Sequence, residues 1–163
     1  MGIGQLKCAV LDVNDLEVAE AFWSEVTGLP VIPSAFPGRF SYLGQLDPRK
    51  LELILHLVKA EKGEETNRAH VDIWVQDVDR AIEQIQAIGG SLKRAPTIYP
   101  RPGSYPNVRP GLDWAVMRDP FGNEFCLTTV LRPEQAEAVL ALPPELHADD
   151  LALRRAAGVT APS

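Results

Sequence analysis

Residues that cross-link chains or bind metals are scarce in this sequence: its 163 residues include two cysteines and three histidines. So few cysteines exclude a disulfide-rich scaffold. The two could pair with each other, but in a reducing cytosol free thiols or metal ligands are the favoured interpretation. The sequence also lacks any apolar run of the ~18 to 20 residues that a membrane helix needs.

Two further absences limit the compartment and the binding partners that we expect. The first residues, "MGIGQLKCAV", lack the apolar core and cleavage site of a secretory signal, so we expect a cytoplasmic protein with no membrane association. There is no excess of basic residues either, because 16 Lys and Arg stand against 22 Asp and Glu and the basic residues are scattered. Nucleic acid is therefore excluded as an expected partner.

The sequence does contain an internal repeat. "CAVLDVNDLEVAEAFWSEVTG" from Cys8 resembles "HVDIWVQDVDRAIEQIQAIGG" from His70, and one offset aligns Asp15 with Asp77 and Gly28 with Gly90. In each segment a strand precedes a helix with one apolar stripe that ends at glycine. We expect Asn14 and Glu17 to cap the first helix.

Three strands are expected after each helix, which makes each half a βαβββ module. They are "LPVIPS", "RFSYLGQL" and "LELILHLV" in the first half, and "SLKRA", "LDWAVMRD" and "NEFCLTTV" in the second. We predict one α+β domain over residues 1–131, with modules at about 5–58 and 69–131 joined by a charged connection at 59–68. Residues 132–163 are predicted to be a helical tail broken at Pro143 and Pro144.

Tandem βαβββ modules and the "DPFGNEF" turn before the last strand resemble the vicinal oxygen chelate superfamily of glyoxalases, bleomycin-resistance proteins and dioxygenases. The glyoxalase-like branch is the nearest in pattern. The resemblance implies that a curved mixed sheet encloses a cleft holding a small-molecule ligand. It also implies a homodimer, which a tail stripe of Ala136, Val139, Leu140 and Leu142 would support by needing a surface to cover it.

Strand alternation indicates which side chains line that cleft. They are residues 8, 10 and 12, 54 and 56, 70, 72 and 74, and 124, 126 and 128. From these we assign catalytic roles to His70, Asp72 and Glu124, and substrate binding to Asp12, His56, Trp74, Cys126 and Thr128.

Metal-binding members of the superfamily place ligands on the first and last strand of each module. Carried over, those positions fall on Cys8, His70, Cys126, and either Ile54 or His56. The glutamates that the family commonly uses are missing, which argues against a ring-cleaving dioxygenase and against any glutamate-ligated metal. We expect no cofactor; the alternative is zinc bound by Cys8, His56, His70 and Cys126.

Each of these side chains also has a structural interpretation. Both cysteines could be buried filler, and Cys126 could instead be a nucleophile. His70 and Asp72 could handle protons or only satisfy each other by hydrogen bonding. Glu124 could act as an acid or base, or cap its strand in solvent. The loop from Pro96 to Gly111 is the expected specificity element.

Two functions from different classes remain. The first is an enzyme of the lyase or isomerase type that acts on a small oxygenated metabolite. The second is a non-catalytic protein that sequesters a small molecule, as bleomycin-resistance proteins do. The polar residues His70, Asp72 and Glu124 favour the enzyme, and the missing carboxylate ligands favour the binding protein.

Overall fold

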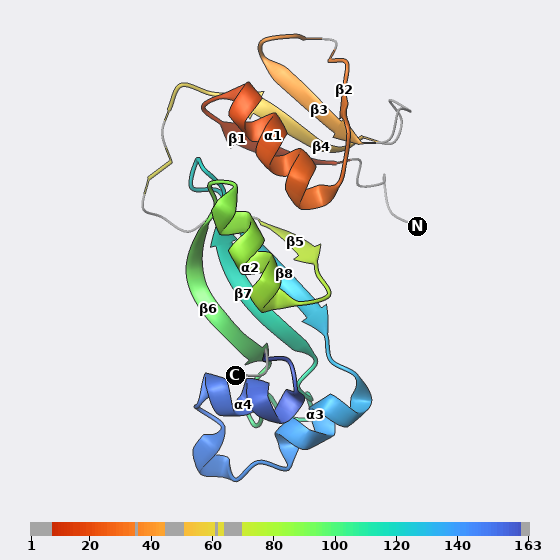
Figure 1. Cartoon of the computed structure of the whole chain (residues 1–163), viewed down its shortest axis with the longest axis vertical. Coiled ribbons are helices and arrows are strands. Elements are labelled where there is room, and N and C mark those ends of the chain that lie inside the picture. Colours follow the sequence, from red (N-terminus) through yellow and green to blue (C-terminus); the bar gives the residue numbers. More distant parts are fainter. Residues whose placement is uncertain (1–7, 35, 45–50, 61, 64–69, 161–163) are drawn as a thin grey trace. The chain divides into compact units, whose positions relative to one another are not determined.

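A computed structural model describes the chain except for residues 1–7, 35, 45–50, 61, 64–69 and 161–163. The described chain divides into two compact units (Figure 1). Unit 1 contains residues 1–71 and 118–123, and unit 2 contains residues 72–117 and 124–163. Most of the expected connection at 59–68 lies outside the described residues.

Unit 1 has the first βαβββ module. Its strands are β1 (Ala9–Val13), β2 (Val31–Ile32), β3 (Phe40–Gly44) and β4 (Leu51–Leu57), and they lie in the order β1-β4-β3-β2. β1 runs parallel to β4, whereas β2 and β3 are antiparallel neighbours and so are β3 and β4. The sheet is therefore mixed, as the family resemblance implies.

Helix α1 (Leu16–Thr27) covers one face of this sheet (Figure 1). Its buried Phe22 and Trp23 pack edge to face with ring centroids 5.4 Å apart, while Leu43, Leu53 and Leu55 are among the buried residues of the sheet. The predicted Asn14 cap is wrong. Asp15 caps the helix by accepting from the Val18 amide, and Asn14 instead donates to the carbonyls of Val58 and Ala60.

Unit 2 repeats the module. Its strands β5 (Val71–Trp74), β6 (Ser91–Tyr99), β7 (Leu112–Arg118) and β8 (Glu124–Val130) lie in the order β5-β8-β7-β6, which matches the first sheet strand for strand. Helix α2 (Val78–Ala87) is capped by Asp77, the repeat partner of Asp15. Both tandem modules and the α+β class are confirmed.

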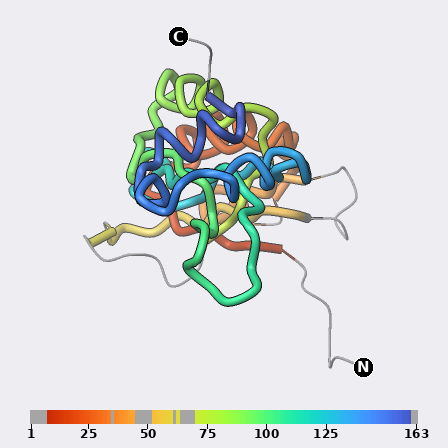
Figure 2. The backbone as a smooth tube through the Cα atoms, turned by 90° about the horizontal axis from the view of Figure 1, so that it is seen from below, coloured from red at the N-terminus to blue at the C-terminus, as the bar shows by residue number. Residues whose placement is uncertain are grey.

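The loop after β6 is shorter than predicted. Residues 96–99 continue the strand, so the loop begins at Pro100 and ends at Gly111. Thr97 and Ile98 are buried, and burial of these two side chains outweighs the weak strand propensity of Pro96. The remaining loop is the teal segment that extends from the sheet in Figure 2.

The tail forms α3 (Pro133–Leu140), the 3₁₀ turn η2 (Pro144–Leu146) and α4 (Asp150–Ala157), with α4 packed on β6. Ala136 and Val139 are buried in their own chain, Val139 with Ile98 and Leu153. The argument for a dimer from an uncovered stripe is therefore wrong, since only Leu140 of that stripe is markedly exposed.

A buried ion pair fixes the tail to the sheet. Arg154 on α4 is 6% exposed and donates from Nε and Nη2 to both carboxylate oxygens of Asp113 on β7, at 2.8 and 2.9 Å. Its Nη1 donates to Asp79 on α2 at 3.0 Å.

Among the described helices, none combines the length and apolar character required to cross a membrane.

The "DPFGN" turn belongs to unit 1, although it leads into β8 of unit 2. Asp119 Oδ1 accepts from the amides of Phe121 and Asn123, and Oδ2 accepts from the indole of the buried Trp23 at 3.2 Å. The Asn123 side chain donates to the Asp12 carbonyl at 2.7 Å. Burial raises the pKa of Asp119 above its ordinary value, and the hydrogen bonds from Asn123, Phe121 and Trp23 oppose that rise.

Candidate functional site

Three side chains of the types that can bind metals meet where β5 lies beside β8. His70 precedes β5, Asp72 lies on it with the same parity, and Cys126 lies on the neighbouring strand. One ligand-type atom from each lies within 4.8 Å of the other two. Among the residues that the structure describes, this is the single such group of His, Cys, Asp or Glu side chains.

The Cys126 side chain lies on the sheet face opposite the helices. Its neighbours on β8, Phe125 and Leu127, are buried on the side that α2 covers, so alternation directs Cys126 to the other side. The thiol is nevertheless only 4% exposed. Burial raises its pKa, and the charge and hydrogen bond of Asp72 add to that rise, whereas a hydrogen bond from Trp114 opposes it.

Glu124 is buried beside the same group. It is 5% exposed, and its Oε1 accepts from Lys93 Nζ at 2.5 Å. The interpretation of Glu124 as a solvent-exposed residue that only caps its strand is therefore wrong. Sequence reasoning missed Lys93, because the pair joins β6 to β8 and nothing local in "SLKRA" points to a partner 31 positions away.

Aromatic side chains surround this region of the second sheet. Trp74 follows Asp72 on the same face and is 64% exposed, and Thr128 is buried. Trp114 on β7 was also missed, although the alternation in "LDWAVMRD" was a usable signal for it. Its ring lies 5.7 Å from that of Tyr99, and the Arg94 guanidinium lies 5.0 Å from its centroid.

The site residues predicted on the first module form a separate pair. Asp12 on β1 is opposite His56 on β4, and His56 Nδ1 lies 2.9 Å from Asp12 Oδ1. Val10 is opposite Ile54, so His56 and Ile54 share a face, as predicted. Cys8 precedes Asp12 by four residues, roughly 13 Å along a strand, so this register does not bring Cys8 and His56 to one ion.

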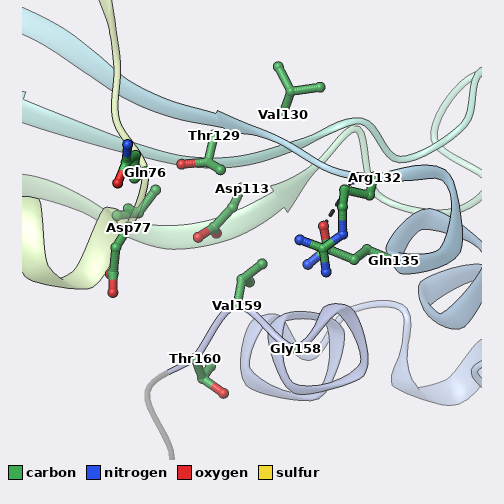
Figure 3. A pocket seen from close by; sticks show the side chains of 11 residues that line it. Gln76, Asp77, Asp113, Thr129, Val130, Arg132, Gln135, Gly158, Val159 and Thr160 are labelled. Carbon is green, nitrogen blue, oxygen red and sulfur yellow. Dashed lines mark hydrogen bonds between the residues drawn. The ribbon is translucent and has the colours of Figure 1, made fainter.

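Unit 2 also contains a pocket of about 290 Å³ on its helical side (Figure 3). In this view Gln76 and Asp77 lie opposite Arg132 and Gln135, and Asp113 lies between them. The other residues that line it are Val78, Thr129, Val130, Gly158, Val159 and Thr160. Both polar atoms of the Gln135 side chain have hydrogen-bond partners: its oxygen accepts from the Arg132 amide, and its nitrogen donates to the Ala157 carbonyl.

Comparisons with known proteins identify the family of the chain. Residues 8–128 match the family model described as the Glyoxalase-like domain. No curated protein matches the chain.

Solved structures with the same fold include three informative examples. A hypothetical protein, SA1046 of S. aureus, is 18% identical with a TM-score of 0.57, covering 79% of this chain and 95% of its own. A glyoxalase/bleomycin resistance protein/dioxygenase family enzyme of Burkholderia phytofirmans PsJN is 21% identical with a TM-score of 0.56, covering 78% and 100%.

The third example is a mutant of the fosfomycin resistance protein FosX of Listeria monocytogenes, complexed with Mn(II) and 1S,2S-dihydroxypropylphosphonic acid. It is 20% identical with a TM-score of 0.56, covering 77% of this chain and 90% of its own. At these identities the structures establish the fold, and the family match covers most of the sequence. The chain therefore belongs to the glyoxalase-like domain family, within the vicinal oxygen chelate fold.

Proposed function

We propose that this protein is an enzyme acting on a small oxygenated metabolite, with its reactive centre at His70, Asp72 and Cys126. The observation that carries the proposal is the convergence of an imidazole, a carboxylate and a thiol within 4.8 Å. Such convergence on a sheet face next to exposed aromatic rings is typical of small-molecule sites.

The donor set fits a borderline divalent cation. Zinc ligands lie ~2.0 to 2.3 Å from the ion in a tetrahedral arrangement, so two ligands of one ion lie ~3.3 to 3.8 Å apart. The three ligand-type atoms of this group lie within 4.8 Å of one another, so holding the ion would draw them closer together. A nitrogen, an oxygen and a sulfur ligand suit zinc better than a hard ion such as manganese. Although the sequence argues for no cofactor, it does not reveal that Asp72 joins His70 and Cys126.

His70, Asp72 and Cys126 would hold the zinc ion, whose chemistry there would be to polarise an oxygen atom of the substrate. The protein's own residues do the rest in this proposal. A hydrogen bond from Trp114 lowers the pKa of Cys126 and so opposes the rise that burial causes. Glu124 is the acid–base residue in this proposal, and Lys93 Nζ donates a hydrogen bond to its Oε1. Trp74 supplies a wall for the substrate.

FosX supports the choice of substrate class. Its structure holds a metal ion and a compound with two hydroxyl groups and a phosphonate. These ligands belong to FosX. For the present chain, they make small molecules with neighbouring oxygen atoms the first compounds to test.

Metal binding can be tested first without a substrate. Chelator-treated protein titrated with Co²⁺ should bind one ion and develop a near-ultraviolet thiolate-to-cobalt band. Cys126→Ser should abolish the band, whereas Cys8→Ser, the matched control, should leave it. Failure of the wild-type protein to bind Co²⁺ or Zn²⁺ stoichiometrically would contradict the metal centre.

Turnover is tested separately, with zinc-loaded protein and a panel of hydroxy-carbonyl compounds and vicinal diols, each followed by mass spectrometry. We expect conversion of at least one compound, lost in His70→Ala and reduced by roughly 10²-fold or more in Glu124→Gln, a variant expected to keep its metal. Binding without conversion across the panel would favour the alternative, a sequestering protein.

A further inference from the structure

The open face of the first sheet holds a second pair of titratable side chains, within unit 1. His56 Nδ1 is 2.9 Å from Asp12 Oδ1, a distance at which the ring N–H donates to the carboxylate. This bond fixes the tautomer, because the proton on Nδ1 leaves Nε2 with its lone pair. Nε2 is then an acceptor for a proton from outside the pair.

Both partners are held in place by the sheet. Asp12 and His56 are directly opposed on parallel strands, and the Asn123 side chain donates to the Asp12 carbonyl at 2.7 Å. The Phe40 ring stacks on the imidazole, with centroids 4.7 Å apart and planes 16° apart. A stacked ring and a carboxylate together restrict rotation of the imidazole, which is how a proton acceptor is oriented in advance.

We infer that His56, positioned by Asp12, is a general base that acts on the hydroxyl group of a small ligand with an apolar ring. The side chains around the pair determine this ligand class. Val10 and Phe36 are largely exposed apolar residues, Ile54 shares the face of His56, and Phe36 packs against Phe40 at 6.1 Å. An apolar surface beside one proton acceptor matches a phenol-like molecule.

The proton transfer balances without a co-reactant. The ligand O–H bond breaks, an N–H bond forms at Nε2, and the electron pair stays on the ligand oxygen as an oxyanion. The resulting imidazolium is stabilised by the Asp12 carboxylate. Asp12, from β1, is the charged partner of His56, and the Arg39 guanidinium lies 5.4 Å from the centroid of the Phe40 ring that stacks on His56.

This inference goes beyond the proposed function and does not depend on it, because the pair involves none of the three proposed zinc ligands. Its tests therefore run in chelator, on the full chain. The first measures the tautomer of each histidine by long-range ¹H–¹⁵N correlation at a pH where the rings are neutral. His56 should carry its proton on Nδ1 in the wild type.

In Asp12→Asn the proton should move toward Nε2, the tautomer that neutral imidazole prefers in water. Asp12→Glu should restore the Nδ1–H form at least in part, a rescue that a merely structural role for Asp12 does not predict. A predominant Nε2–H tautomer of His56 in the wild type, or one unchanged in Asp12→Asn, overturns the inference.

The second test uses 4-nitrophenol, whose anion absorbs at longer wavelength than the neutral form. Just below the probe's own pKa, binding to the wild type should convert it to the phenolate. His56→Gln should lose the phenolate band, Asp12→Asn should weaken it several-fold, and His147→Gln, the matched control, should not change it. An undiminished band in His56→Gln, or no band in the wild type, overturns the inference. Binding of 4-nitrotoluene, which lacks the hydroxyl, as tightly as 4-nitrophenol also overturns the inference.

Discussion

At the scale of single residues, several polar groups in the "DPFGN" turn and in the strand β8 that follows it are buried rather than solvated. Cys126, Glu124 and Asp119 each have less than a tenth of their surface exposed. A buried polar group destabilises a fold unless it is hydrogen-bonded, so each of these side chains is expected to depend on its neighbours.

Cys126→Ser provides a residue-scale prediction. The smaller, more polar hydroxyl replaces a buried thiol, so the free energy of unfolding of the metal-free protein should fall by no more than ~1 to 2 kcal/mol. Urea unfolding in the presence of chelator measures this. Added zinc should raise the midpoint of the wild type and leave that of Cys126→Ser unchanged, and equal shifts in both proteins would contradict Cys126 as a ligand.

Trp23→Phe tests the turn that carries Asp119. The change removes the indole N–H that donates to Asp119 Oδ2, while the ring face that packs on Phe22 remains. We expect a loss of ~1 to 3 kcal/mol, because a buried carboxylate loses a donor. Trp74→Phe is the matched control, since Trp74 is largely exposed, and thermal unfolding of the two variants should separate them clearly.

At the scale of elements, the tail is held by chemistry as well as by apolar packing. Asp113, Arg154 and Asp79 come from β7, α4 and α2, and one guanidinium joins all three. Thr97 and Arg101 also donate to Asp150 at the start of α4. The tail thus depends on contacts within unit 2.

Arg154→Met should destabilise the protein by ~3 to 5 kcal/mol, since it leaves Asp113 buried without its partner. The double variant Asp113→Val/Arg154→Met should recover much of that loss, because an apolar pair needs no compensating charge. Denaturant unfolding of both variants tests this. A double variant as unstable as Arg154→Met would indicate that packing, rather than the uncompensated charge, governs the tail.

The same carboxylate predicts a pH dependence. Burial raises the pKa of Asp113 above its ordinary 3.8, and the hydrogen bond and charge of Arg154 oppose this rise. A carboxyl with a raised folded pKa contributes stability at low pH that is lost as the pH rises through that pKa. Arg154→Met removes the opposing effects, so its deficit against wild type should shrink as the pH falls from neutral toward 3.8. A constant deficit across that range would contradict the argument.

At the scale of the whole molecule, the two modules have the same strand order but different chemistry. The first sheet carries Asp12 with His56, and the second carries His70 with Asp72 and Cys126. The repeat therefore supplied two similar scaffolds with separate sets of side chains, and each set can be tested without the other.

A homodimer remains a prediction that rests on the family resemblance, now that the tail is known to cover its own stripe. Light scattering on the purified full chain should give twice the 17.9 kDa monomer mass. A mass equal to one chain at all accessible concentrations would contradict it.

The sequence alone determined the two modules, the helix stripes and the faces of the strands. These follow from local periodicity: one offset aligns Asp15 with Asp77 at the start of equivalent helices, and alternation in "NEFCLTTV" separates Cys126 from Phe125. Tertiary structure alone decided which side chains meet. The 44 positions between Asp12 and His56, and the 31 between Lys93 and Glu124, are bridged by strand register, which depends on packing across the whole sheet.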